Sequence, residues 1–288
     1  LPQYYDWPRC ASSRSPGQKP LTRRDEDVAM VIRSRERIAR MKKEILGIDI
    51  GGSGIKGAPV NLKKGTLSRD RLRIPTPTGA KPKDIARTIK EITSHFNWHG
   101  PVGCGFPGVV RDGRALTAAN IHKSWIGTSV ETLIREATGC PCHALNDADA
   151  AATAMVAYGD AASIRGTVLV VTVGTGLGTA LFHDGILLPN TELGHIELSG
   201  GDAEAYASDR VRKELGLSWK VWAKRLGLYL RSMEQLFWPE LIILGGGVSK
   251  EFDRFARHLK TTTRVIASSL KNEAGIVGAA LAAGQHLL

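Results

Sequence analysis

Apolar and polar positions along the chain follow two patterns. Short apolar runs predict buried strands, and they alternate with segments whose apolar residues recur every three or four positions, as on one face of a helix. Strand patterns cover residues 46–60 and 170–182, each with a glycine turn inside, and also 102–110, 144–147, 167–173 and 241–244. Helix patterns cover 84–96, with Asp84 as N-cap, 129–137, 148–158, 218–237 and 272–285. Strands that alternate with helices predict an α/β fold.

Local signals mark several of these boundaries. Ser129 and Ser218 are predicted helix caps, and Gly139 ends the helix that Ser129 begins. The last helix is rich in alanine and glycine, so it is expected to pack closely on a neighbour. A further short charged helix is predicted over 28–43, and a strand is expected to carry Arg69, Arg71 and Arg73.

The stretch 46–60 predicts a phosphate-binding hairpin. Its glycines allow positive φ and close approach of the backbone, so several N–H groups can point at one phosphate. The spacing Gly52-x-Gly54-x-x-Gly57 also fits a dinucleotide fingerprint, but that motif must open a helix, and Pro59 would break one. Asp49, just before the turn, would hold Mg²⁺ through water or only stiffen the hairpin.

A second hairpin repeats this design about 120 residues later, around Gly174-Thr175-Gly176-Leu177-Gly178. Either hairpin alone could be unrelated to the other, but the pair favours a duplicated domain with a cleft between the halves. A third glycine run, Gly245 to Gly247, follows a buried strand and can pass close to a nucleotide. In α/β folds, ligands bind at the carboxyl ends of the strands, where all three glycine runs lie.

Polar residues with suitable chemistry lie beside these turns. Asn146-Asp147 offers an amide to orient a hydroxyl and a carboxylate to take its proton, although Asp147 could instead be only a helix cap. Glu192 and His195, three residues apart, bind sugar hydroxyls or form an ordinary surface pair. The loop Gly105-Phe106-Pro107-Gly108 is expected to give a sugar a rigid apolar wall.

Composition and charge narrow the class of protein. The chain has 288 residues, 42% of them hydrophobic, and no apolar run long enough for a membrane span. Four cysteines indicate a reducing, cytoplasmic location. Cys140-Pro141-Cys142-His143 resembles half a metal site, but without a second ligand pair a buried strand edge is the favoured interpretation. Of the net charge of +11, residues 1–43 carry more than half, which favours a solvated, poorly ordered leader over a nucleic-acid arm.

Six motifs in order then identify a family resemblance. They are Gly47-Ile48-Asp49-Ile50-Gly51-Gly52-Ser53, Gly105-Phe106-Pro107-Gly108, Asn146-Asp147-Ala148-Asp149-Ala150, Gly174-Thr175-Gly176-Leu177-Gly178, Glu192-Leu193-Gly194-His195 and Gly245-Gly246-Gly247-Val248-Ser249. From about residue 44 onward the chain resembles the ROK family of sugar kinases, and within it the glucokinase branch that uses polyphosphate.

The resemblance implies a two-domain, actin-like (ribonuclease H-like) α/β sugar kinase fold with a central cleft. It places an N-terminal domain at 44–147, joined by the C-terminal helix 272–288, and a C-terminal domain at 148–271, after a basic leader at 1–43. It implies phosphorylation of the 6-hydroxyl of glucose, and of mannose, from polyphosphate or ATP with Mg²⁺, in a homodimer that binds neither nucleic acid nor membrane.

The resemblance also assigns roles to residues. Asp147 is the general base, and the sugar ligands are Gly105, Phe106, Pro107, Gly108, Asn120, Asn146, Glu192, His195 and Glu204. The phosphate and nucleotide ligands are Asp49, Gly51, Gly52, Ser53, Gly54, Lys56, Gly174, Thr175, Gly176, Gly178, Gly245, Gly246 and Gly247, with Asp49 also the candidate Mg²⁺ residue.

One departure and two alternatives accompany the resemblance. Many ROK members have a zinc-binding cysteine cluster after the Gly-His pair, but residues 198–203 contain no cysteine, so no zinc site is predicted. A non-catalytic, sugar-responsive regulator of the same family is one alternative, but 1–43 is too short and poorly patterned for a helix-turn-helix. An acetate-kinase-like or chaperone-like actin relative is the other, and the sugar-type residues disfavour it.

Cations near the first hairpin either line a polyphosphate groove or form a solvated face: Lys56, Lys63, Lys64, Arg69, Arg71 and Arg73.

Overall fold

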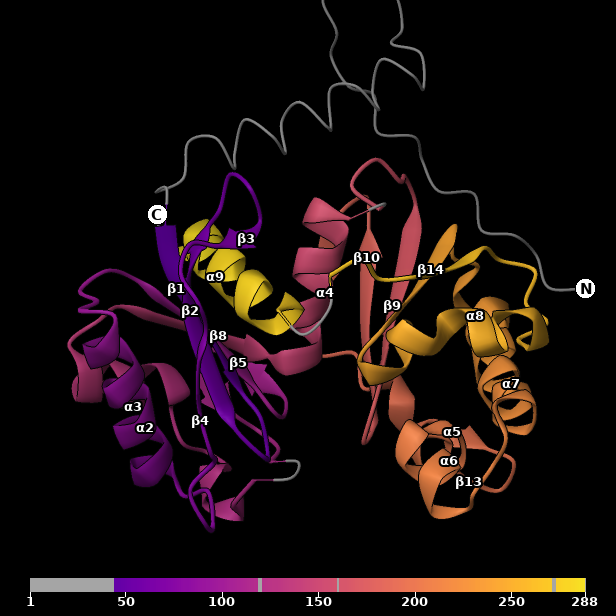
Figure 1. Cartoon of the computed structure of the whole chain (residues 1–288), viewed down its shortest axis with the longest axis horizontal. Coiled ribbons are helices and arrows are strands. Elements are labelled where there is room, and N and C mark those ends of the chain that lie inside the picture. Colours follow the sequence, from indigo (N-terminus) through magenta and orange to yellow (C-terminus); the bar gives the residue numbers. More distant parts are fainter. Residues whose placement is uncertain (1–43, 119–120, 160, 271–272, 288) are drawn as a thin grey trace, which may run out of the picture.

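The computed structural model describes residues 44–118, 121–159, 161–270 and 273–287. The predictions for residues 1–43 and for Asn120 therefore lie outside the described residues. The two larger β-sheets stand face to face, with helices packed between them and further helices on their outer faces (Figure 1).

The first sheet holds the first predicted hairpin. Its order is β3-β2-β1-β5-β8, and β4 also pairs with β2. Strands β1, β5 and β8 are parallel, so their carboxyl ends meet at one edge of the sheet. The strands are β1 (Glu44–Ile50), β2 (Ile55–Asn61), β3 (Thr66–Leu67), β4 (Leu72–Ile74), β5 (Val102–Phe106) and β8 (Cys142–Asn146).

The second sheet repeats this topology. Its order is β11-β10-β9-β14-β15, so again an antiparallel three-strand meander is followed by two strands parallel to the first. This equivalence confirms the predicted duplication. The strands are β9 (Thr167–Val173), β10 (Leu177–His183), β11 (Ile186–Leu188), β14 (Leu241–Gly245) and β15 (Val265–Ala267). Two short hairpins, β6 (Val110–Arg111) with β7 (Arg114–Ala115) and β12 (Glu197–Leu198) with β13 (Gly201–Asp202), lie outside the sheets.

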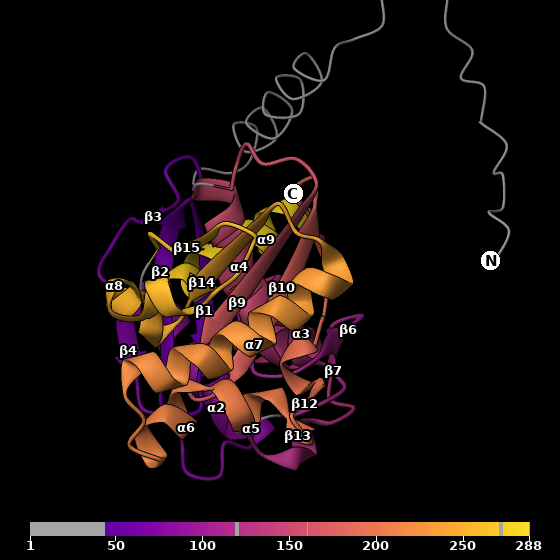
Figure 2. The ribbon, with the colours of Figure 1, turned by 90° about the vertical axis from the view of Figure 1, so that its right-hand side faces the viewer.

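Alternation along the strands separates three apolar layers. In β1, Leu46 and Ile48 face a core with α2 (Pro82–His95) and α3 (Val130–Thr138), whereas Ile45 faces α4 (Asp147–Tyr158) and α9 (Ala274–His286). In β9, Val168 and Val170 face that same central layer, and Leu169 and Val171 face α7 (Trp219–Phe237). Helix α7 crosses the outer face of the second sheet (Figure 2).

The remaining helices are short. They are η1 (Lys123–Trp125), η2 (Leu193–His195), α5 (Ala203–Ala207), α6 (Asp209–Glu214), η3 (Gly247–Glu251), α8 (Phe252–Phe255) and η4 (Ala256–His258). No helix among the described residues has the length and apolar character needed to cross a bilayer.

Helices α4 and α9 pack closely between the sheets, as the alanine- and glycine-rich sequence of α9 predicted. A Cβ added at Gly278 of α9 would overlap the carbonyl oxygen of Ala150 in α4. Gly47 of β1 and Gly103 of β5 meet backbone atoms of α9 in the same way. The C-terminal helix therefore packs on the first sheet. Its assignment to the N-terminal domain and the domain boundaries stay predictions.

Most local boundaries agree with the sequence, and three differ. Ser129, Ser218 and Gly139 cap their helices as predicted. The predicted Asp84 cap is wrong: Lys81 is the N-cap and Pro82 begins the helix, because the fixed φ of proline suits the first helical position.

Two strands are shorter than predicted. Strand β5 ends at Phe106 rather than at 110, since the chain turns at Gly108, whose φ is 156°. Strand β4 begins at Leu72, so it includes Arg73 but not Arg69 or Arg71. The segment 140–143 enters a buried strand as interpreted: Cys140 and Cys142 are buried, and the sulfur of Cys142 lies 3.9 Å from that of Cys104.

Candidate active site

The first glycine turn joins β1 to β2 and is held by charged side chains. Asp49, near the end of β1, faces Lys56 of β2, with Nζ 2.9 Å from Oδ2. A guanidinium nitrogen of Arg73 donates to the carbonyl of Ser53 at 2.9 Å. A Cβ at Gly54 would lie 2.7 Å from Arg73 Nε, so a larger residue there would have to displace the guanidinium. Lys56 and Arg73 thus bring two cations to this turn, and Arg73 also fixes its shape.

The second glycine turn, between β9 and β10, packs on the start of α4. Gly174 N–H donates to the carbonyl of Gly176 at 3.0 Å. A Cβ at Gly178 would lie 2.8 Å from the Cβ of Ala148. Because Ala148 follows Asp147, this contact brings the second turn to the carboxyl-end edge of the first sheet. Thr175, at the tip, is exposed.

Glu204, from α5, lies under this second turn. Its Oε2 accepts a hydrogen bond from Leu177 N–H at 3.0 Å, and a Cβ at Gly176 would overlap that oxygen. Its Oε1 lies 3.9 Å from Arg210 of α6. Glu204 therefore links the turn to α6.

The third glycine run follows β14 and reaches the same edge. Gly246 has a φ of 77°, and a Cβ there would overlap backbone atoms of Val173 at the end of β9. Gly245 is buried, whereas Gly246 and Gly247 are exposed. All three predicted glycine runs therefore lie at strand carboxyl ends, as the topology of an α/β fold requires of a ligand site.

Asp147 begins α4 where these elements meet. Asn146, and not Asp147 alone, caps the helix: its Oδ1 accepts from the N–H groups of Ala148 and Asp149 at 2.8 and 3.0 Å. Asp147 Oδ1 also accepts from Ala148 N–H at 2.8 Å. The interpretation of Asp147 as only a cap is therefore disfavoured, because its neighbour already performs that function.

The surroundings of Asp147 make its carboxylate an unusually strong base. Burial, the negative charge of Asp49 and that of Glu192 raise the pKa of Asp147 from 3.8 to about 7, against the opposing hydrogen bond from Ala148 N–H. A general base works best when its pKa lies near the working pH. At neutral pH about half of the Asp147 side chains would be ready to accept a proton.

The predicted sugar side of the site forms a continuous polar chain. Asn146 Nδ2 donates to the carbonyl of Gly108 at 3.2 Å and to Glu192 Oε1 at 3.5 Å. Glu192 Oε2 lies 3.9 Å from His195 Nε2. His195 Nδ1 lies 2.8 Å from Asp202 Oδ2, and this hydrogen bond raises the pKa of His195.

One predicted contact needs correction. The Phe106 ring is fully buried and packs edge-on against Trp125, with ring centroids 5.0 Å apart. The ring therefore cannot form an apolar wall for a sugar. Pro107 and Gly108 are also buried, and the Gly108 carbonyl already accepts from Asn146.

Sequence reasoning missed three polar residues here. Asp202 holds His195, and Asp149 and Asn190 form hydrogen bonds beside Asn146. Asp149 and Asn190 are 41 residues apart, and no spacing signal could have paired them. Among the described residues, no group of three or more histidine, cysteine, aspartate or glutamate side chains is arranged to hold a metal ion.

Each of the two sheets has the same topology and a glycine turn at its carboxyl edge, and the sheets meet at a partly buried carboxylate and a polar loop. This arrangement defines the two-domain actin-like fold of sugar kinases. The chain belongs to the ROK family, whose sequence model matches residues 45–215.

Relatives agree with this membership. The chain is 44% identical to a polyphosphate glucokinase of Mycobacterium tuberculosis over 245 residues, which cover 85% of this chain and 92% of that protein. It matches the structure of an inorganic polyphosphate/ATP-glucomannokinase from an Arthrobacter species with a TM-score of 0.80 and 44% identity, over 84% of this chain and 98% of the other. A ROK glucokinase from Streptomyces griseus, solved with glucose and AMPPNP, matches with a TM-score of 0.72 and 26% identity, over 84% and 99%.

Proposed function

We propose that this protein is a glucokinase that transfers a phosphoryl group from inorganic polyphosphate or ATP to the 6-hydroxyl of glucose. The observation that carries the proposal is the position of Asp147. This carboxylate, with its raised pKa, begins α4 where the second glycine turn packs, next to a chain of hydroxyl-binding side chains. The named activities of the 44%-identical relatives support the same reaction.

Each part of the site then has a task. Asp147 accepts the proton of the 6-hydroxyl as that oxygen attacks the terminal phosphorus, and the bond to the leaving phosphate breaks. The N–H groups of the two glycine turns, with Lys56, hold the donor phosphates. Asn146, Glu192, His195 and Glu204 orient the sugar, because these side chains offer both donors and acceptors.

Mg²⁺ fits the carboxylate at the end of β1. Asp49 is partly exposed, and Gly275 packs directly against it, with the position of an added Cβ 3.2 Å from Asp49 Cγ. A bound Mg²⁺ would neutralise charge on the donor phosphates. Asp49 would hold the ion through water; in the metal-free protein, its charge raises the pKa of Asp147.

The proposal extends to mannose and to polyphosphate. Mannose differs from glucose in the orientation of the 2-hydroxyl, and one hydrogen bond contributes about 1 kcal/mol, so both sugars should react. Polyphosphate needs cations beyond the turns. Arg69 contacts the Phe96 ring and carbonyl, and Arg73 is used by the turn. Lys63 and Lys64 are exposed and follow β2 at the end of that strand opposite the glycine turn, so a polymer would have to run along the strand to reach them.

Two further features follow from the same proposal. We place the enzyme in the cytoplasm, which the free thiols of Cys104, Cys140 and Cys142 support. We also propose a homodimer formed through α7, since the exposed Leu236 and Trp238 lie at the end of this helix. Light scattering on the purified protein tests the second point, and a monomer at all concentrations would contradict it.

The test is a matrix of donors and acceptors. Purified protein with Mg²⁺ is given ATP or long-chain polyphosphate, each with glucose, mannose, fructose or N-acetylglucosamine. We expect the 6-phosphates of glucose and mannose from both donors. If no donor yields a sugar phosphate although glucose binds, the proposal fails. DNA binding that survives moderate salt would then support a regulator.

A further inference from the structure

Asn190 joins the second sheet to the loop that follows β5 in the first. It lies two residues beyond β11. Its Oδ1 accepts from Val110 N–H at 3.0 Å, and its Nδ2 donates to the Val110 carbonyl at 2.9 Å. One side chain thus satisfies both backbone groups of a residue 80 positions away, as a neighbouring strand would.

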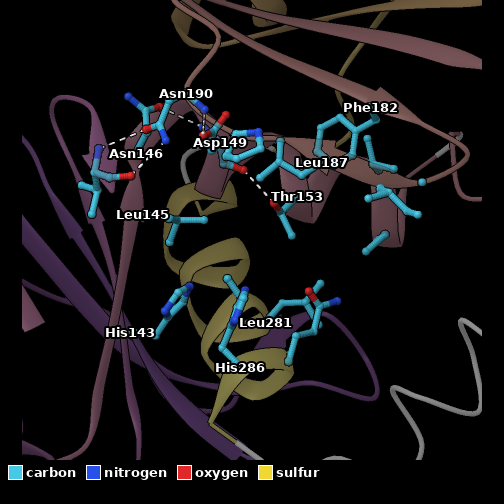
Figure 3. A pocket seen from close by; sticks show the side chains of 18 of the residues that line it. His143, Leu145, Asn146, Asp149, Thr153, Phe182, Leu187, Asn190, Leu281 and His286 are labelled. Atoms are coloured by element: carbon cyan, nitrogen blue, oxygen red, sulfur yellow. Dashed lines mark hydrogen bonds between the residues drawn. The ribbon is translucent and has the colours of Figure 1, made fainter. Parts of the chain in front are cut away.

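A buried carboxylate fixes the backbone of Asn190. Its N–H donates to Asp149 Oδ2 at 2.7 Å, and Asp149 is only 1% exposed (Figure 3). The other oxygen, Oδ1, is buried and has no partner among the described residues. An aspartate with an unpaired oxygen is costly to bury, so the fold maintains this contact at the expense of stability.

The same few residues hold the sugar side of the site. Asp149 N–H is capped by Asn146, whose Nδ2 contacts Gly108 and Glu192. Glu192 lies two residues after Asn190, and Gly108 two residues before Val110. Asn190 therefore sets the position of the loop that carries Glu192 and His195 relative to the loop after β5.

The space beside this link is open. A cavity of about 980 Å³ lies between the two halves, lined by residues of β8, α4, α9 and β11, and Asn146, Asp149 and Asn190 lie together at one end of it (Figure 3). Two halves that are incompletely packed can move relative to one another. A specific link at the end of the cavity would then control how the sugar loop meets α4.

We propose that Asn190 is a positioning residue that ties the 190–195 loop to Val110, so that Glu192 and Asn146 are ready to bind the sugar before it arrives. This inference rests on the proposed function for the identity of the sugar. Without the link, the loop becomes ordered only when glucose binds. The cost of this ordering weakens the affinity for glucose but leaves the reacting atoms unchanged. We expect KM for glucose to rise about tenfold, with kcat within twofold of wild type.

The variant is chosen to avoid strain. Asn190 has a φ of 60°, a conformation that glycine adopts freely, so Asn190→Gly removes the side chain without forcing the backbone. Asn97→Gly is the matched control, because Asn97 has a φ of 48° and its side chain is exposed, with a hydrogen bond to the nearby His99. Asn190→Asp keeps an acceptor for Val110 N–H but turns a carboxylate oxygen toward the Val110 carbonyl, so we expect a KM at least as high as that of Asn190→Gly.

Three measurements decide the matter: glucose affinity by calorimetry, KM and kcat with polyphosphate, and hydrogen exchange at Val110 N–H. We expect weaker glucose binding and faster exchange in Asn190→Gly, with Asn97→Gly unchanged. Affinity within twofold of wild type, or an equal loss in Asn97→Gly, would overturn the inference, as would a fall in kcat with unchanged KM. Calorimetry needs no turnover, so this test stands even if the kinase proposal fails.

Discussion

Replacing Asp147 with asparagine should stabilise the free protein at alkaline pH while it removes activity. Burial, with the charges of Asp49 and Glu192, raises the pKa of Asp147 from 3.8 to about 7. The folded state therefore disfavours the ionised carboxylate. Asparagine has nearly the same shape, carries no charge and can still accept from Ala148 N–H, so the unfavourable interaction disappears and the hydrogen bond remains.

The sign and size of the stability change follow from the linkage between proton binding and folding. Between the unfolded pKa of 3.8 and the folded value of about 7, the folded state binds the proton and the unfolded state does not, so wild-type stability falls as pH rises through this window. At about 1.36 kcal/mol per pH unit, the ionised Asp147 lowers the free energy of unfolding by about 4 kcal/mol above pH 7. This value is an upper limit, because Asp147 is only partly buried. At pH 5 it falls below about 2 kcal/mol.

Denaturant unfolding at pH 5 and pH 8, followed by tryptophan fluorescence, measures this difference. We expect Asp147→Asn to gain about 2–4 kcal/mol at pH 8 and clearly less at pH 5. Asp209→Asn serves as a control of opposite sign. Although burial opposes it, hydrogen bonds from Lys213 and Arg212 lower the pKa of Asp209, so removal of its charge should destabilise at pH 8, and the loss should fade as pH falls through that lowered pKa. A loss of stability in Asp147→Asn at pH 8, or a gain independent of pH, would refute the reasoning.

Three other predictions can be checked separately. Neutralising Lys63 and Lys64 should raise KM for polyphosphate and spare ATP in steady-state assays; an equal effect on both donors would exclude a polymer groove. Gly278→Ala should destabilise the fold by about 3 kcal/mol or more in denaturant unfolding, since its Cβ would overlap a carbonyl oxygen of α4. In NMR titrations, Asp202→Asn should lower the pKa of His195, because the Asp202 carboxylate stabilises the protonated imidazole in the wild type as pH rises through 6.5. An unchanged titration of His195 would contradict the ion pair.

The sequence predicted those features that depend on local signals. Each glycine turn lies between two apolar strands, and both turns lie at the carboxyl ends of the parallel strands. The duplicated topology followed from the repeat of that pattern. The Ser129 and Ser218 caps depend on one side chain and the next turn of helix, so they too could be read from the sequence.

Features that depend on distant contacts could not be predicted. The direction of the Phe106 ring depends on how β5 packs against Trp125, and not on the loop sequence. The link between Asn190 and Val110 joins residues 80 positions apart, and the partner of His195 comes from a separate turn at Asp202. Local sequence also misled at Asp84, because a favourable capping residue was outweighed by the proline two positions earlier.

Turnover by Asp147→Asn when it is saturated with glucose tests the central claim most directly, namely that this carboxylate removes the proton of the sugar hydroxyl. A positioned general base contributes about 10²- to 10⁴-fold to the rate, whereas the glucose-binding side chains remain in place. We therefore expect calorimetry to show glucose affinity within a few-fold of wild type, with formation of glucose 6-phosphate at least about 100-fold slower. Turnover within tenfold of wild type at saturating glucose would contradict the account.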